Sequence, residues 1–226
     1  MPLSNQQLTD RIDQNIPNSG TYGVFTLLND VFTSAVFTAA AATDAFTFAA
    51  PHKLVTGSRF QISASVKTPQ TLLATTTYYA IVTSTTELKP ALTLALANSS
   101  TAINFTDDGA GTLTLIEQSL TVEDPIAVLI NHELNATDDP NYARVTYANP
   151  GGAVNGVKPT FEFSQAVSAS NPTLDFRSVF LIKGGTTTIG NTTGTKDYLI
   201  AAPARVLITA GSSKIIRFTV SLENKP

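Results

Sequence analysis

The sequence predicts a mainly β protein that begins with a short helical arm, and three observations lead to this expectation. Threonine, whose β-branched side chain suits pleated strands, occurs 34 times. After residue 46, apolar and polar residues alternate in short runs, which is the period of a half-buried strand. Gly, Pro, Asn and Asp separate these runs, as turns between strands require. A helical period is confined to the first 35 residues.

The composition argues against several classes of function. The formal net charge is −3 and the sequence has no run of Lys or Arg, so we expect no nucleic acid as a partner. Cysteine is absent, which excludes disulfide bonds and thiolate metal sites. No apolar run approaches the roughly 18 residues of a membrane span. The N-terminal residues also lack the basic and apolar regions of a signal peptide, so we expect neither membrane insertion nor a cleaved signal.

Residues 1–35 are predicted to form a helical docking or oligomerisation arm. Ser4 and Gln7 have the spacing of a capping box, in which the two side chains satisfy free backbone N–H groups at a helix start. Two apolar stripes follow, and they need cover because isolated helices of this length are marginal in water. A helical hairpin packed on its own domain is the alternative. The residues assigned to docking or oligomerisation are Leu8, Ile12, Ile16, Leu27, Leu28, Val31 and Phe32.

Residues 36–118 are predicted to form a small β-module of short strands. Apolar and polar residues alternate in "SRFQISA" at 58–64, and "TTYYAIV" at 76–82 is aromatic and β-branched. The leucines at 92–96 alternate with small or polar residues, which also indicates a strand. The cluster "TDDGAG" at 106–111 predicts a turn before the last strand of the module.

Residues 119–226 are predicted to form an antiparallel β-sandwich or jelly-roll-like domain. The continuous apolar run "IAVLIN" at 126–131 indicates a strand covered on both faces. The clearest alternation comes at 216–222, where apolar side chains share one face. The boundary with the preceding module is placed near 118–124, where acidic residues cluster ahead of Pro125.

Three motifs lie between residues 52 and 115. A His-x-Leu-x-Thr-Gly turn leads into a strand, a Thr-x-Tyr-Tyr strand follows, and a Gly-x-Gly-Thr hairpin comes last. The motif residues are His52, Leu54, Thr56 and Gly57, then Thr76, Tyr78 and Tyr79, then Gly109, Gly111 and Thr112. In order and spacing they resemble a small β-module that recurs in tail-fibre, baseplate and other virion proteins of tailed bacteriophages. The first 35 residues are similar to the start of some phage fibre proteins, in which a short helix and a glycine turn precede a "LLNDVF-S" helix, here Leu27 to Phe32 with Ser34.

The resemblance implies a structural protein of a tailed phage particle, made in the host bacterial cytoplasm and located in the virion. It favours a fibre, fibre adaptor or baseplate component of the tail, acting by assembly and not by catalysis. The implied partners are other virion proteins and copies of the chain itself, with a homotrimer suggested by the fibre resemblance. A capsid decoration or cement protein is one alternative. A receptor- or glycan-binding module of the tail, with a host surface glycan as partner, is another.

The sequence predicts no catalytic, cofactor or metal site. The two histidines, His52 and His132, are far apart in unlike contexts, and no Gly-x-Ser-x-Gly nucleophile elbow is present. The acid pairs at 107–108 and 138–139 lie in turn sequences, which explains them without catalysis, although a glycosidase pair or a weakly bound Ca²⁺ is the alternative. The glycine-rich stretch at 182–197 lacks the Gly-Lys-Ser/Thr ending of a phosphate loop and predicts an exposed hairpin loop. This stretch and residues 148–159 are the places where we expect recognition of a partner, if the protein has a recognition tip.

Overall fold

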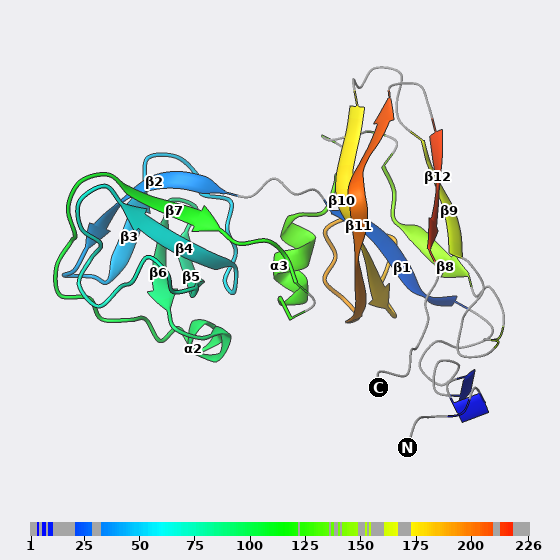
Figure 1. Cartoon of the computed structure of the whole chain (residues 1–226), viewed down its shortest axis with the longest axis horizontal. Helices are drawn as coiled ribbons and strands as arrows, with labels where there is room; N and C mark the ends of the chain where they lie inside the picture. Colours follow the sequence, from blue (N-terminus) through cyan, green and yellow to red (C-terminus); the bar gives the residue numbers. More distant parts are fainter. Residues whose placement is uncertain are drawn as a thin grey trace. The chain divides into compact units, whose positions relative to one another are not determined.

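The chain is mainly β, as predicted, and divides into two compact units. One unit is Asp30–His132, and the other combines Met1–Asn29 with Glu133–Pro226. Figure 1 shows the computed structural model with each strand labelled. The structure describes residues 4, 6–7, 9–10, 21–28, 33–121, 123–135, 137, 140, 142–148, 152, 154, 161–166, 173–209 and 213–218.

The unit Asp30–His132 contains a closed antiparallel barrel of six strands, in the order β2-β3-β6-β5-β4-β7. In this closed order each barrel strand pairs with a neighbour on both sides. Two short helices, α2 (Leu94–Asn98) and α3 (Ile126–Asn131), belong to the same unit. The barrel strands are β2 (Ser34–Ala40), β3 (Ala45–Phe48), β4 (Arg59–Ala64), β5 (Tyr78–Ser84), β6 (Glu87–Ala91) and β7 (Leu113–Glu117).

Aromatic side chains fill the barrel because alternate strand residues point inward. Phe46 and Phe48 are buried while Thr47 between them is exposed. The ring centroid of Phe46 lies 4.2 Å from that of Phe37 and 5.7 Å from that of Phe105. Contacts of this kind stabilise a core beyond the area that they bury.

The second unit contains two sheets, whose strand orders are β11-β10-β1-β8 and β12-β9. Strand β1 pairs with β10 on one side and with β8 on the other, so a segment from the start of the chain lies inside a sheet of C-terminal strands. The strands are β1 (Thr21–Leu28), β8 (Val145–Ala148), β9 (Phe161–Ala166), β10 (Thr173–Lys183), β11 (Thr195–Thr209) and β12 (Ser213–Phe218).

The helical arm predicted for residues 1–35 is wrong over Thr21–Leu28, because these residues form β1. Their threonine, tyrosine, valine and phenylalanine favour strands, and pairing on both sides provides the hydrogen bonds. Near the N-terminus, residues 6–7 and 9–10 are helical. The capping box is present there: the Gln7 amide donates to Ser4 Oγ at 3.3 Å, and the Ser4 amide donates to Gln7 Oε1 at 2.9 Å.

Two strands expected from apolar patterning are helices instead. The run at 126–131 forms α3 and buries Val128, Leu129 and Ile130, because a short apolar run fits a buried helix as well as a buried strand. The leucine alternation at 92–96 runs into α2, where the Thr93 side chain caps the helix by accepting from the Leu96 amide at 3.2 Å. The unit boundary at His132 also places α3 with the barrel, whereas the sequence put it in the C-terminal domain.

Replacing Phe46 by alanine is expected to destabilise the barrel by about 3–5 kcal/mol, because it leaves a cavity among aromatic rings. Thr47→Ala is the matched control, since the side chain next to Phe46 points outward and its loss is expected to cost no more than about 0.5 kcal/mol. Urea denaturation measures the free energy of unfolding of both variants, and hydrogen exchange of the barrel amides provides a second measurement. Equal losses of stability in the two variants would contradict the inward–outward assignment.

Candidate functional site

The motif that begins at His52 forms a turn held by the imidazole ring. The residue is 2% exposed, its Nδ1 accepts from the Leu54 amide at 3.0 Å, and its Nε2 lies 3.1 Å from the Ser84 carbonyl oxygen. Since a carbonyl only accepts, Nε2 carries the proton and the ring is the neutral Nε2–H tautomer. Lys53, which lies between His52 and Leu54 in the chain, has a φ of 60°, in the left-handed region. Both ring nitrogens therefore hold the backbone of this turn.

The Thr-Gly end of the same motif ties the turn to β5. Thr56 Oγ1 accepts from the Val82 amide at 3.0 Å, and the Gly57 amide donates to the Ala80 carbonyl at 2.9 Å. Gly57 has a φ of 95°, and a Cβ there would come within 3.1 Å of Leu94 Cδ1 and of Pro125 Cγ. The turn thus needs glycine for both its conformation and its close packing.

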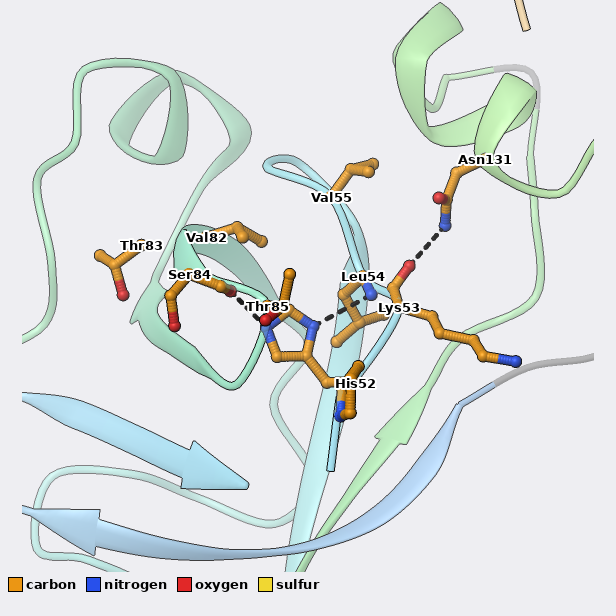
Figure 2. A pocket seen from close by; sticks show the side chains of 10 residues that line it. His52, Lys53, Leu54, Val55, Val82, Thr83, Ser84, Thr85 and Asn131 are labelled. Atoms are coloured by element: carbon orange, nitrogen blue, oxygen red, sulfur yellow. Dashed lines mark hydrogen bonds between the residues drawn. The ribbon is translucent and has the colours of Figure 1, made fainter. Parts of the chain in front are cut away.

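A pocket of about 390 Å³ adjoins this turn. Figure 2 shows the His52 ring between the Ser84 and Leu54 backbones, and Asn131 of α3 reaching the Lys53 carbonyl, to which its Nδ2 donates at 2.8 Å. The lining consists of residues 51–55, residues 82–85 and Asn131. His52 and Lys53 are the ionisable residues of this lining, and the His52 ring is already engaged. The pocket therefore offers no acid–base pair for proton transfer.

A buried polar network lies where the chain enters and leaves the barrel unit. The side chain of Glu117, at the end of β7, is 3% exposed, and its Oε2 accepts from the Thr33 amide at 2.8 Å. Its Oε1 lies 3.0 Å from Nε2 of His132, the last residue of the unit. Thr33 Oγ1 in turn donates to the His52 carbonyl at 2.9 Å. Both histidines of the chain therefore belong to one network, which their separation in sequence did not predict.

A second ion pair of the barrel unit fixes the segment after β7. Arg59 Nε lies 2.6 Å from Asp124 Oδ1, and Arg59 Nη2 lies 3.0 Å from Asp124 Oδ2, which gives a bidentate contact. The hydrogen bond with Asp124 is the main cause that raises the pKa of Arg59 above its ordinary value. The Thr121 amide donates to the same carboxylate at 2.6 Å, and Arg59 Nη2 also donates to the Ser119 carbonyl. These contacts hold the chain between β7 and α3.

A buried ion pair anchors the other unit. The side chains of Arg144 and Glu133 are 0% and 1% exposed, with Arg144 Nε and Nη2 each 2.7 Å from a Glu133 oxygen. Glu133 also accepts from the Tyr142 hydroxyl at 3.0 Å and from the Gly190 amide at 2.8 Å. The pair is thus hydrogen-bonded on several sides, as a buried charge pair requires.

The same arginine holds the glycine-rich loop between β10 and β11. Arg144 donates to the carbonyls of Thr186 and Asn191 at 3.1 and 2.9 Å. The side chains from Thr186 to Thr188 are exposed, as predicted for this hairpin loop. The loop is therefore anchored through its backbone while its hydroxyl groups face solvent.

The acid pair at 107–108 serves turn structure, as predicted. Asp107 Oδ1 accepts from the amides of Gly109 and Gln70 at 2.9 and 3.1 Å, while its other oxygen pairs with Lys67. The hydrogen bond from Lys67 is the main cause that lowers the pKa of Asp107, and the backbone donors act in the same direction. Asp108 Oδ1 accepts from the Ala41 amide at 2.6 Å. The pair at 138–139 lies outside the described residues.

The residues predicted for docking or oligomerisation are only partly described. Leu8, Ile12, Ile16, Val31 and Phe32 lie outside the described residues. Leu27 and Leu28 are in β1, and Leu28 is fully buried and bridges to Glu133. Leu28 is thus used inside its own unit and is not available to a partner.

The sequence does not predict most of the buried charged residues, although one signal marks Glu117. Leu113, Leu115 and Glu117 are spaced by two residues, so the strand that buries the two leucines also turns Glu117 inward. No comparable signal marked Glu133 or Arg144, whose partners include a loop more than 40 residues away.

Within the part of the chain that the structure describes, no three His, Asp or Glu residues form a metal-binding group. No described helix has the length and apolar character needed to cross a membrane. In comparisons with known proteins, the chain matched no protein-family model, no curated protein and no solved structure.

Replacing Glu117 by alanine is expected to destabilise the barrel unit by about 3 kcal/mol, because it leaves the Thr33 amide and the His132 ring without their buried acceptor. The loss should be accompanied by faster hydrogen exchange at the Thr33 amide. Glu123→Ala, which removes an exposed carboxylate nearby, is the control and should change little. Unchanged stability and Thr33 exchange in Glu117→Ala would show that the network carries no stability.

The Asp107 carboxyl is expected to titrate below its ordinary value of 3.8, and Lys67→Met should move its titration upward. Because folding lowers the pKa of Asp107, its contact with Lys67 stabilises the folded barrel at pH values above the pKa that this carboxyl has in the unfolded chain. This stabilisation is lost as the pH falls through the lower folded value. Carboxyl carbon NMR measures the titration in both proteins. Identical titration midpoints would contradict the role of Lys67.

Proposed function

We propose that this chain is a structural component of a tailed phage particle, associated with the tail as a fibre, fibre adaptor or baseplate protein. The observation that carries the proposal is that the motifs of the phage-like module lie together in one closed barrel. His52 and Gly57 form the turn before β4, Tyr78 opens β5, and Gly109 and Gly111 form the turn before β7.

The roles of these residues support a module maintained for its shape. Tyr78 is 2% exposed, and its hydroxyl accepts from the Leu73 amide at 2.6 Å. Gly109 and Gly111 have φ values of 75° and 80°, and a Cβ on Gly109 would come within 2.8 Å of the Lys67 carbonyl oxygen. Each motif thus specifies a packed turn or a strand, which is what a recurring assembly module requires.

A role in assembly rather than catalysis is supported by the state of the buried polar groups. Glu117, Glu133 and Asp124 each accept from protein donors, and both nitrogens of His52 are bonded to the backbone. A catalytic acid or base has to reach a substrate proton. Within the described residues, these groups hold chain segments together.

We propose that the chain assembles with other virion proteins and with copies of itself as a homotrimer. The second unit, with its four-stranded and two-stranded sheets, is proposed to be an antiparallel sandwich or jelly-roll-like domain. A capsid decoration protein remains the alternative within the particle.

A glycan-binding module of the tail is a second candidate, favoured by one observation. The loop that carries Thr186–Thr188 exposes hydroxyl groups on a backbone held by Arg144. A loop already ordered before binding loses less conformational entropy when a ligand is bound. A glycan array tests this candidate, probed with the full chain and with a variant that has alanine at these three threonines. The candidate requires that the full chain binds a glycan and that the variant does not.

Antibodies raised against the full chain are expected to label the tails of phage particles produced from the genome that encodes it. Gold-labelled antibody and electron microscopy locate the label, and mass spectrometry of purified particles measures its copy number. Particles from a strain lacking the chain provide the control for antibody specificity. Label confined to the head would favour the decoration protein, and absence of the chain from purified particles would refute a virion role.

A further inference from the structure

Two buried ring nitrogens, one from each histidine, make hydrogen bonds of opposite kinds. His132 Nε2 lies 3.0 Å from a carboxylate oxygen of Glu117, so it donates, and a protonated ring can still donate there. His52 instead uses Nδ1 to accept from the Leu54 amide at 3.0 Å. Figure 2 shows this nitrogen facing the amide, while the other faces the Ser84 carbonyl. The bond between His52 and Leu54 therefore requires a ring nitrogen that carries no proton.

Protonation of His52 is incompatible with the turn that its ring holds. A protonated imidazole has an N–H group on both nitrogens and accepts from neither. Nδ1–H would then face the Leu54 N–H across 3.0 Å, at a residue that is buried from water. Buried donors without acceptors and a desolvated charge are both unfavourable, so the proton binds more readily once the turn has opened. Lys53 is also held at a φ of 60°, which is uncommon for residues other than glycine, so opening relieves this conformation.

The groups around the His52 ring do not compensate a positive charge. In the described part of the chain, the ring has no carboxylate among its hydrogen-bond partners. Phe48 of β3 packs against it with an uncharged ring, and Lys53 adds a like charge in the turn itself. Among the carboxylates of neighbouring strands, Glu87 of β6 accepts from a threonine hydroxyl of its own hairpin, and Glu117 of β7 is connected to the turn only through a threonine. The neutral ring is thus the form that the closed turn selects.

We propose that residues 52–57, which we call the His52 turn, form an acid-sensitive latch in the barrel unit. Two other segments are attached to this turn: the uncharged Asn131 side chain of α3 donates to the Lys53 carbonyl at 2.8 Å, and Thr33, just before β2, donates to the His52 carbonyl at 2.9 Å. Protonation of the ring opens the turn and loosens both attachments, together with one wall of the adjoining pocket. The latch is a property of the barrel unit itself, so it holds whether or not the chain belongs to a phage particle.

Amide hydrogen exchange of the full chain, measured by NMR as protection factors that correct for the intrinsic effect of pH, tests the latch. Measurements at about pH 7.5 and about pH 5.5 bracket the value of about 6.5 at which an exposed imidazole takes up a proton. If opening binds one proton, the protection of the Leu54 amide falls about tenfold over this interval. The Ile103 amide, which donates to the Pro90 carbonyl at 2.8 Å outside the turn, should keep its protection. Unchanged protection of Leu54, or an equal loss at both amides, would overturn the proposal.

Two variants identify the histidine that takes up the proton. His52→Asn keeps an acceptor near the position of Nδ1, because an asparagine side chain bonds the amide two residues further on, but it does not titrate. Its Leu54 protection is expected to be equal at the two pH values. His132→Gln is the matched control, since its side-chain amide can still donate to Glu117, and it should show the same tenfold fall as the wild type.

The outcomes of these variants decide between the latch and other titrating groups. An acid response that persists in His52→Asn, or that disappears in His132→Gln, would assign the proton to a different group and overturn the proposal. The wild-type comparison of Leu54 with Ile103 remains decisive if either variant does not fold.

Discussion

The Glu117 carboxylate joins the two ends of the barrel unit, and the packing of that unit depends on it. One oxygen accepts from Thr33, just before β2, and the other lies 3.0 Å from the ring of His132 after α3. A buried carboxylate depends on such donors, because an unpaired charge in the interior is costly. Thr33 extends the network to His52, whose ring orders the turn before β4. The network thereby holds together β2, β7, α3 and the His52 turn of the barrel unit.

Glu133, which follows His132 in the chain, belongs to a similar buried polar network in the other unit. Glu133 pairs with Arg144 and accepts from Gly190, which connects the end of β1 to the loop between β10 and β11. His132 and Glu133 are adjacent in sequence, yet each belongs to a buried polar network within its own unit. Each unit therefore has its own anchor at the point where the chain passes between them. Buried polar groups used in this way define geometry, which suits a protein whose proposed role is assembly.

The sequence predicted the features that depend on local chemistry. Alternation around Phe46, the turn at Asp107 and the capping box at Ser4 follow from neighbouring residues, and the structure contains each of them. The features that depend on distant partners were missed. Leu27, Leu28, Val31 and Phe32 have helical spacing, but strands from the C-terminal part pair with Thr21–Leu28 on both sides. The networks of Glu117 and Glu133 also join residues far apart in sequence, which no local pattern encodes.

We propose that this chain is an assembly module whose closed barrel forms part of a phage tail. An electron microscopy map of the whole particle at side-chain resolution tests it most directly. We expect tail density that fits the six-stranded barrel, with the Glu117 carboxylate between Thr33 and His132 and several copies around the tail axis. A fully assigned map in which no tail density fits the barrel would show that the chain is not a tail component.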